Sequence, residues 1–168
     1  MNLWLRFFYI VWIKRSRLID RFKTEFNLIC FPNDLDQLLH MNNGRYLTLL
    51  DLGRIDLLIA TGIFKEMKTR KIIPVVRCQS VQYFSSLKVF QKFKIQTELT
   101  GWDHDQIYLQ QKFIRHNKIV AKAYINCCLI GAKRNKIQID SFLNSCNIHL
   151  PNQLEHADDS YKYWIDGI

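Results

Sequence analysis

One apolar stretch, NNGRYLTLLDLGRIDLLIATG from Asn42 to Gly62, limits the folds open to this chain of 168 residues. Its large residues recur at helical spacing rather than in strict alternation. Asn42 and Asn43 are both natural N-caps, and Gly62 is a natural stop. The stretch therefore predicts one helix of four to five turns that is apolar around more than half of its circumference, as a helix wrapped by a sheet should be. The residues at helical spacing are Tyr46, Leu49, Leu50, Gly53 and Leu57.

Strand-like runs surround this helix. Residues Phe22 to Phe31 read as a first strand that ends at the turn signal Pro32-Asn33. Four β-like runs follow the helix without a second convincing helix, at 72–84, 89–102, 106–114 and 119–131. The last three are joined by short turns and predict an antiparallel meander. This order favours an α+β fold.

The ends of the chain read differently from this central part, residues 22–132. Residues 1–21 combine an apolar run, too short to span a bilayer, with a basic end, so we expect a helix that lies on an anionic membrane surface. Packing of that helix on its own domain or in a subunit interface is the alternative. Residues 133–168 carry little periodicity and read as a loop-rich extension with one short helix around 141–145.

The composition excludes several classes of protein. The net charge of +9 should attract anionic partners, but the basic residues are dispersed and no nucleic-acid-reading motif accompanies them, so we expect no nucleic-acid partner. The five cysteines show no CxxC, and the histidines lack metal-ligand spacing, so we expect neither a disulfide framework nor a metal. With no phosphate-binding glycine loop either, no cofactor is expected, and the reducing cytoplasm is the expected compartment.

The stretch DLDQLLHMNNGRY, Asp34 to Tyr46, carries the chemical signal. The pattern of Asp34 and Asp36, His40 to Asn43, and Tyr46 resembles the signature of the 4-hydroxybenzoyl-CoA thioesterase-like group of hotdog-fold proteins. In that fold an antiparallel β-sheet wraps around one long central helix. The continuation YLTLLDLGR and the hydrophobic leader look closest to the thioesterase superfamily member 6 branch.

This resemblance implies roles for particular residues. Asp36 matches the acid that drives thioester hydrolysis, and Asn43 matches the residue whose backbone N–H polarises the carbonyl. A second arm of the superfamily keeps its acid inside the helix, where Asp51 stands here. Asp51 also lies three residues before Arg54, so an ion pair on the helix explains it without catalysis. His40 is a candidate helper that bonds the carbonyl or orients the loop.

The remaining expectations concern the substrate and the assembly. Asn42, Tyr46 and Leu50 are the candidate substrate-binding residues, and Asp34 reads as a turn former. The resemblance implies hydrolysis of an acyl-CoA, with coenzyme A as part of the substrate, a role in lipid metabolism, and a homodimer or dimer of dimers. A non-catalytic acyl-CoA-binding or membrane-associated scaffold protein, or a hotdog hydratase or dehydratase, are the alternatives.

Overall fold

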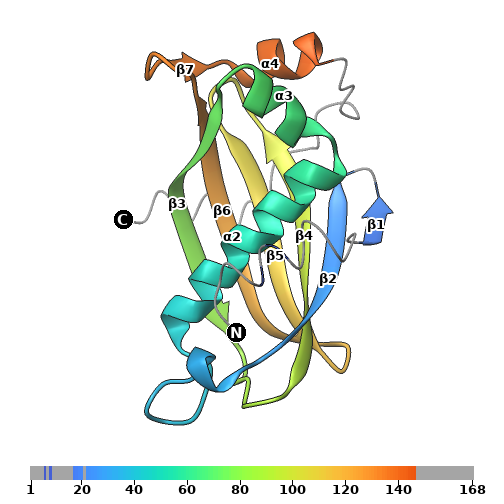
Figure 1. The fold of residues 1–168 in the computed structure, drawn as a ribbon, viewed down its shortest axis with the longest axis vertical. Coiled ribbons are helices and arrows are strands. Elements are labelled where there is room, and N and C mark those ends of the chain that lie inside the picture. The colour runs from blue at the N-terminus through green and yellow to red at the C-terminus, as the bar shows by residue number, and fades with distance from the viewer. Residues whose placement is uncertain (1–5, 7, 9–16, 21, 147–168) are drawn as a thin grey trace.

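The computed structural model describes residues 6, 8, 17–20 and 22–146 (Figure 1). An antiparallel sheet wraps around one long helix, which confirms the predicted α+β class and hotdog architecture. Its helices are η2 (Pro32–Asp34, a 3-10 turn), α2 (Asn43–Ala60), α3 (Ile63–Thr69) and α4 (Ile139–Ser145). Its strands are β1 (Arg17–Asp20), β2 (Lys23–Ile29), β3 (Ile73–Tyr83), β4 (Lys92–Trp102), β5 (Ile107–Arg115), β6 (Lys118–Ile130) and β7 (Lys136–Ile137).

The strands form one sheet in the order β1-β2-β4-β5-β6-β3, with every neighbouring pair antiparallel and β7 added to the end of β6. The consecutive pairing of β4, β5 and β6 confirms the predicted meander. β3 bonds only to β6 among the described strands, so an edge eleven residues long remains unpaired.

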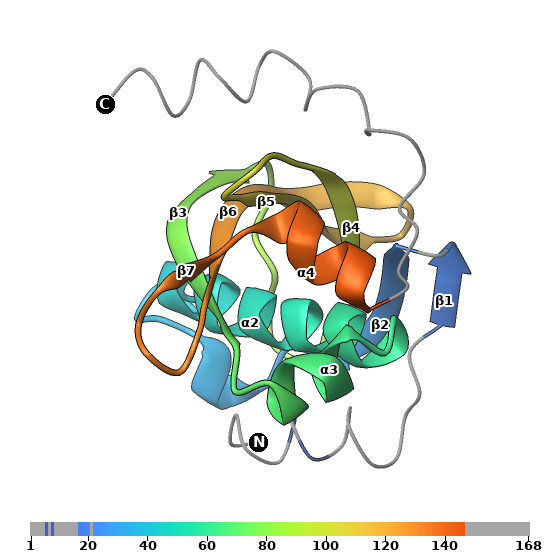
Figure 2. The same ribbon diagram turned by 90° about the horizontal axis from the view of Figure 1, so that it is seen from above.

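The central helix begins at a side-chain cap. Asn42 Oδ1 accepts a hydrogen bond from the Gly44 N–H at 2.8 Å, which identifies Asn42 as the N-cap. The helix then crosses the concave face of the sheet (Figures 1 and 2). Gly53 allows a close approach there, because a Cβ at this position would lie 2.5 Å from Gln111 Nε2 and 2.6 Å from Thr97 Oγ1. A larger residue would push the helix away from β4 and β5.

Besides the two-residue strand β7, which lies in the expected loop-rich extension, the structure differs from the sequence expectations in two elements. α3 was missed, since its seven residues follow Gly62 directly and are too short to show a helical repeat. Gly62 separates it from α2 with a φ of +78°. The other difference is β1, because Arg17–Asp20 pairs with β2 although we expected these residues to end a helix. The rest of that expected helix lies outside the described residues, apart from helical Arg6 and Phe8.

Two hydrophobic clusters fill the interior. The larger one lies between α2 and the sheet and includes Tyr46, Leu49 and Leu50. The smaller one joins α3 and α4 to the end of the sheet, through residues such as Met67 and Phe142. α4 confirms the short helix expected near 141–145, and it lies with α3 at the end of the molecule opposite η2 and the start of α2 (Figure 1). Within the described ranges, no helix has the length and apolar character needed to cross a membrane.

Candidate active site

Asp34 is the buried centre of the loop that leads into α2. Its side chain is fully buried, and its carboxylate pairs with the guanidinium of Arg6 and with that of Arg45, whose Nε donates at 3.1 Å. The carboxylate also accepts the Phe31 N–H at 2.8 Å, and the Asp34 carbonyl accepts the Asn42 N–H at 2.8 Å. Asp34 is therefore more than the expected turn former, since it fixes the loop, Arg6 and the helix start to one another.

Asp36 has a different environment two residues later. It is partly exposed, and its backbone N–H donates to the His40 carbonyl at 2.8 Å. Its Oδ1 accepts the N–H groups of Leu38, at 2.9 Å, and of His40, at 3.4 Å. No residue that the structure describes bonds its other oxygen, Oδ2. The loop therefore orients this carboxylate beside His40 and leaves one oxygen available to a water molecule.

The start of α2 presents a backbone donor close to this loop. Asn43 is the first helical residue, its side chain is exposed, and its N–H has no hydrogen-bond acceptor among the described residues. The positive end of the helix dipole lies at the same place. The Tyr83 hydroxyl, on the last residue of β3, lies 3.5 Å from the Asn43 carbonyl oxygen. The end of β3 therefore adjoins the amide that was predicted to polarise a thioester.

The expected substrate-binding residues separate into two groups. Asn42 is exposed at the cap, whereas Tyr46 is 2% exposed and Leu50 is fully buried in the larger cluster. The Tyr46 ring makes edge contacts with Tyr83 and Phe113 at centroid distances of 5.1 and 4.8 Å. Burial raises the pKa of Tyr46 to about 12. Tyr46 and Leu50 therefore pack inside the larger hydrophobic cluster, between α2 and the sheet.

Asp51 belongs to a polar chain that crosses from α2 to the sheet. Its exposed carboxylate pairs with Arg54, which confirms the ion pair predicted from their spacing. Arg54 is nearly buried, and its other donor bonds Gln111 Oε1 at 3.1 Å. Gln111 in turn donates to the Leu50 carbonyl at 3.0 Å and to Thr97 Oγ1 at 2.9 Å. Sequence spacing pointed to the first of these contacts only, because the others join residues distant in the chain.

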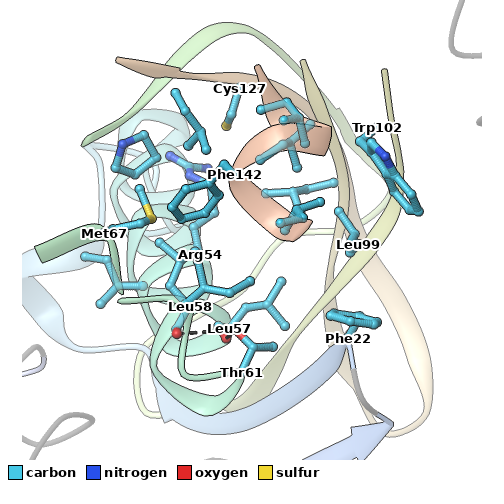
Figure 3. A pocket seen from close by; sticks show the side chains of 18 of the residues that line it. Phe22, Arg54, Leu57, Leu58, Thr61, Met67, Leu99, Trp102, Cys127 and Phe142 are labelled. Carbon is cyan, nitrogen blue, oxygen red and sulfur yellow. Dashed lines mark hydrogen bonds between the residues drawn. The ribbon is translucent and has the colours of Figure 1, made fainter. Parts of the chain in front are cut away.

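A cavity of about 380 Å³ begins at this ion pair (Figure 3). The second half of α2, with Leu57, forms one wall, the strands β3 to β6 form another, and α3 and α4 close the far end. Asp51, and Pro74 and Val76 of β3, line the cavity and are also exposed, so the cavity reaches solvent between α2 and β3. Leu50, a residue expected to bind the substrate, does not line this cavity but lies in the larger cluster. The apolar Ile139, Phe142 and Leu143 at helical spacing could have indicated the buried face of α4.

The two candidate regions lie apart within one chain. Asp51 lies eight positions after Asn43 on the helix, a rise of about 12 Å. A reacting carbonyl must lie about 3 Å from both its oxyanion donor and its attacking group. One chain therefore cannot use the Asn43 amide and the Asp51 carboxylate on the same carbonyl. Across the described part of the chain there is also no cluster of residues that could hold a metal ion.

Comparisons with known proteins agree with this geometry. The family model of the Thioesterase-like superfamily matches residues 30–154. The fold and the site define a hotdog protein of the thioesterase type, and the chain belongs to the Thioesterase-like superfamily. This membership confirms the resemblance seen in the sequence.

Individual relatives fit the same family. Protein THEM6 of Drosophila melanogaster is 34% identical over 163 residues, which cover 92% of this chain and 78% of that protein. The solved structure of YbaW, a probable thioesterase from Escherichia coli, has a TM-score of 0.68 at 22% identity and covers 74% of this chain and 96% of YbaW. The gentisyl-coenzyme A thioesterase BH1999 has a TM-score of 0.65 at 16% identity, covering 71% of this chain and 98% of that one.

Proposed function

We propose that this chain hydrolyses an acyl-CoA thioester to a free acid and coenzyme A. The observation that carries the proposal is the apolar cavity beside α2, which opens at the surface where a charged coenzyme could remain in water. Membership in the Thioesterase-like superfamily and the hotdog fold support the same activity. Coenzyme A takes part as the leaving group of the substrate, and the positive net charge of the chain favours its phosphates.

Asp36 is the proposed general base. Its Oδ2 would take a proton from a water molecule while the water oxygen attacks the thioester carbonyl carbon. The charge that develops on the carbonyl oxygen would be stabilised by the Asn43 N–H, a contact worth on the order of 3 kcal/mol. When the carbon–sulfur bond breaks, the proton held by Asp36 would pass to the sulfur of coenzyme A. His40 lies in the same turn and would help to orient the carbonyl.

A second copy of the chain is the proposed partner at β3. An unpaired edge of eleven residues would template other chains unless it is covered, and β3 also exposes Ile73, Val75 and Val76 to 58%, 38% and 37%. In a symmetric dimer the same surface patch of the two copies meets, and a two-fold axis perpendicular to β3 would set the two copies of this strand antiparallel. We therefore propose a homodimer that joins the two sheets through β3.

This dimer would also complete the active site. With the axis near the middle of β3, at Cys78, the Tyr83 end of one strand opposes the Ile73 end of the other. Tyr83 adjoins Asn43, so Asn43 of the partner subunit would lie close to the mouth of this chain's cavity. The acyl group would enter past Asp51, while the thioester carbonyl meets Asp36 and Asn43 of the partner subunit. Asp51 would then face the site without being its base.

Peripheral association with the inner face of a membrane remains a proposal for residues 1–21. Its support is the aromatic and basic sequence of that segment, most of which lies outside the described residues. Of the cations in this segment, the structure describes the side chain of Arg6, which is buried against Asp34. The described part of the segment therefore contacts its own domain through Arg6 and through β1, whatever surface its other residues meet.

Release of free thiol from a panel of acyl-CoAs tests the activity. The wild-type chain should turn over at least one of them, and Asp36→Asn should lower kcat by roughly 10²–10⁴-fold. Asp51→Asn, the matched substitution at the second acid, should alter KM more than kcat. No thiol release from any acyl-CoA by the folded wild type would refute the proposal and favour a binding or scaffold protein, whereas hydration of an enoyl-CoA would favour a hydratase.

A further inference from the structure

The polar side chains on the cavity wall already have partners. Arg54 bonds Asp51 and Gln111. Thr61 Oγ1 donates to the Leu57 carbonyl at 2.8 Å, and Trp102 Nε1 donates to Asp140 Oδ1 at 3.0 Å. Apart from Arg54 at the mouth, which has more N–H groups than these two bonds use, they leave no side-chain donor among the residues that line the cavity except a thiol.

That thiol belongs to Cys127, which is buried on β6. Burial raises the pKa of the Cys127 thiol to about 11, so it stays protonated and behaves as a small apolar group. A hydroxyl or carboxyl group placed in the cavity beyond Arg54 would lose its water without gaining a matched hydrogen bond. Such a loss costs roughly 1–3 kcal/mol for each group. The wall thus selects against a hydroxylated aromatic acyl group and accepts a hydrocarbon.

The far end of the cavity is closed by α4. Ile139, Phe142 and Leu143 are buried there and line the cavity together with Met67 of α3 (Figure 3). The residues at this end belong to the smaller hydrophobic cluster and not to the larger one between α2 and the sheet. The acyl chain that enters at Asp51 would run along α2 and stop at these side chains.

Polar contacts hold α4 in this position. The Ile139 N–H donates to the His104 carbonyl at 3.0 Å, and Asp140 accepts from Trp102. At the other end of α4, Arg70 bonds the Ser145 carbonyl at 3.0 Å and lies 5.7 Å from the centre of the Phe142 ring. Contacts at both ends hold α4 in place, so its side chains Ile139, Phe142 and Leu143 form a fixed end wall of the cavity, here called the floor.

From these observations we infer that the cavity takes an aliphatic acyl chain and that α4, through Phe142 and Leu143, sets the greatest chain length. This inference rests on the proposed function for the identity of the reacting group, but the hydrocarbon site itself does not require catalysis. A methylene group fills about the volume of one water molecule in the liquid, ~30 Å³, so the cavity holds a chain of roughly a dozen carbons.

Binding of non-hydrolysable S-alkyl-CoA thioethers to the full chain, measured by calorimetry over a series that lengthens by single carbons, tests this inference. Affinity should rise roughly fourfold with each methylene that enters the cavity. The rise should stop when the chain reaches α4, at roughly a dozen carbons. An S-(hydroxybenzyl)-CoA thioether should bind at least about fivefold more weakly than an S-alkyl thioether that fills a similar volume.

Substitutions in α4, the floor of the cavity, should change the chain length at which affinity stops rising. Phe142→Ala should extend the rise to longer chains, and Leu143→Phe should end it earlier. If Phe142→Ala does not fold, Phe142→Leu replaces it, with an extension of about one methylene. Phe113→Leu is the matched control, because Phe113 is fully buried but does not line the cavity, and it should leave the limit unchanged.

Each outcome separates the inference from the proposed function. An unchanged limit in the folded floor variants, or equal affinity for the hydroxybenzyl and alkyl thioethers, would overturn the inference even if the chain hydrolyses acyl-CoA. A shifted limit would support it even if no thioester were hydrolysed, in which case only the proposed activity would fail.

Discussion

Replacing Asp34 with asparagine should destabilise the protein strongly, although the two side chains have nearly the same shape. The new amide oxygen could still accept the Phe31 N–H, so the substitution removes mainly the negative charge. The Arg6 side chain, which is 0% exposed, would then be a buried cation without its anion. Removing one partner of a buried ion pair costs about 3–5 kcal/mol. Arg45 adds less, because a quarter of its side chain is exposed to water.

Urea unfolding followed by tryptophan fluorescence measures this loss. In thermal unfolding of a chain of this length each kcal/mol shifts Tm by about 2–4 °C, so Tm should fall by about 6–20 °C. Asp36→Asn is the matched control, since Asp36 is partly exposed and its carboxylate bonds only nearby backbone. We expect it to cost no more than about 1 kcal/mol.

The two substitutions should therefore have opposite profiles. Asp34→Asn should lower stability, while Asp36→Asn should keep stability and lower the rate of thiol release. If Asp34→Asn were as stable as Asp36→Asn, the burial of the Arg6 pair and the division of roles between the two aspartates would both be refuted.

Three further predictions concern other parts of the chain. Gly53→Ala should destabilise the protein by about 1–3 kcal/mol, because the added Cβ overlaps Gln111; a more stable variant in urea unfolding would contradict the close approach of α2 to the sheet. Because burial raises the pKa of Tyr46 to about 12 from its ordinary 10.0, the unfolded chain releases this proton first, and stability should fall as pH rises between these values. Tyr46→Phe should make that fall smaller, and an unchanged slope of unfolding free energy against pH would contradict it. The chain should sediment with anionic vesicles more than with neutral ones, and replacing Trp4 and Trp12 with Ser should reduce this; equal sedimentation of wild type and variant would contradict the anchor.

Local patterns in the sequence predicted the parts of the fold that local physics controls. The helix from Asn43 was predictable because its apolar spacing and the Asn42 cap lie within one short stretch. The ion pair between Asp51 and Arg54 was predictable for the same reason, since three residues on a helix bring side chains together. The strands of the meander follow from alternation and short turns.

Contacts between distant residues were not predictable in this way. Arg6 and Asp34 are 28 residues apart, and nothing in either local sequence indicates that they meet in a buried pair. The cavity depends on α4, which packs against α2 and the sheet from the far end of the described chain. The motif therefore identified Asp36 and Asn43 as candidates. Their position away from the cavity of the same chain is evident only from the structure.

Activity of a mixed dimer tests the central claim most directly, that one site uses Asp36 of one chain and the cavity of the other. Asp36→Asn removes the base, and Leu58→Trp fills the cavity, which Leu58 lines. Each variant alone should be nearly inactive in thiol release, but in a randomly mixed population half of the dimers have one intact site, so about a quarter of wild-type activity should return. No recovery in a mixture proven to contain mixed dimers would contradict the account.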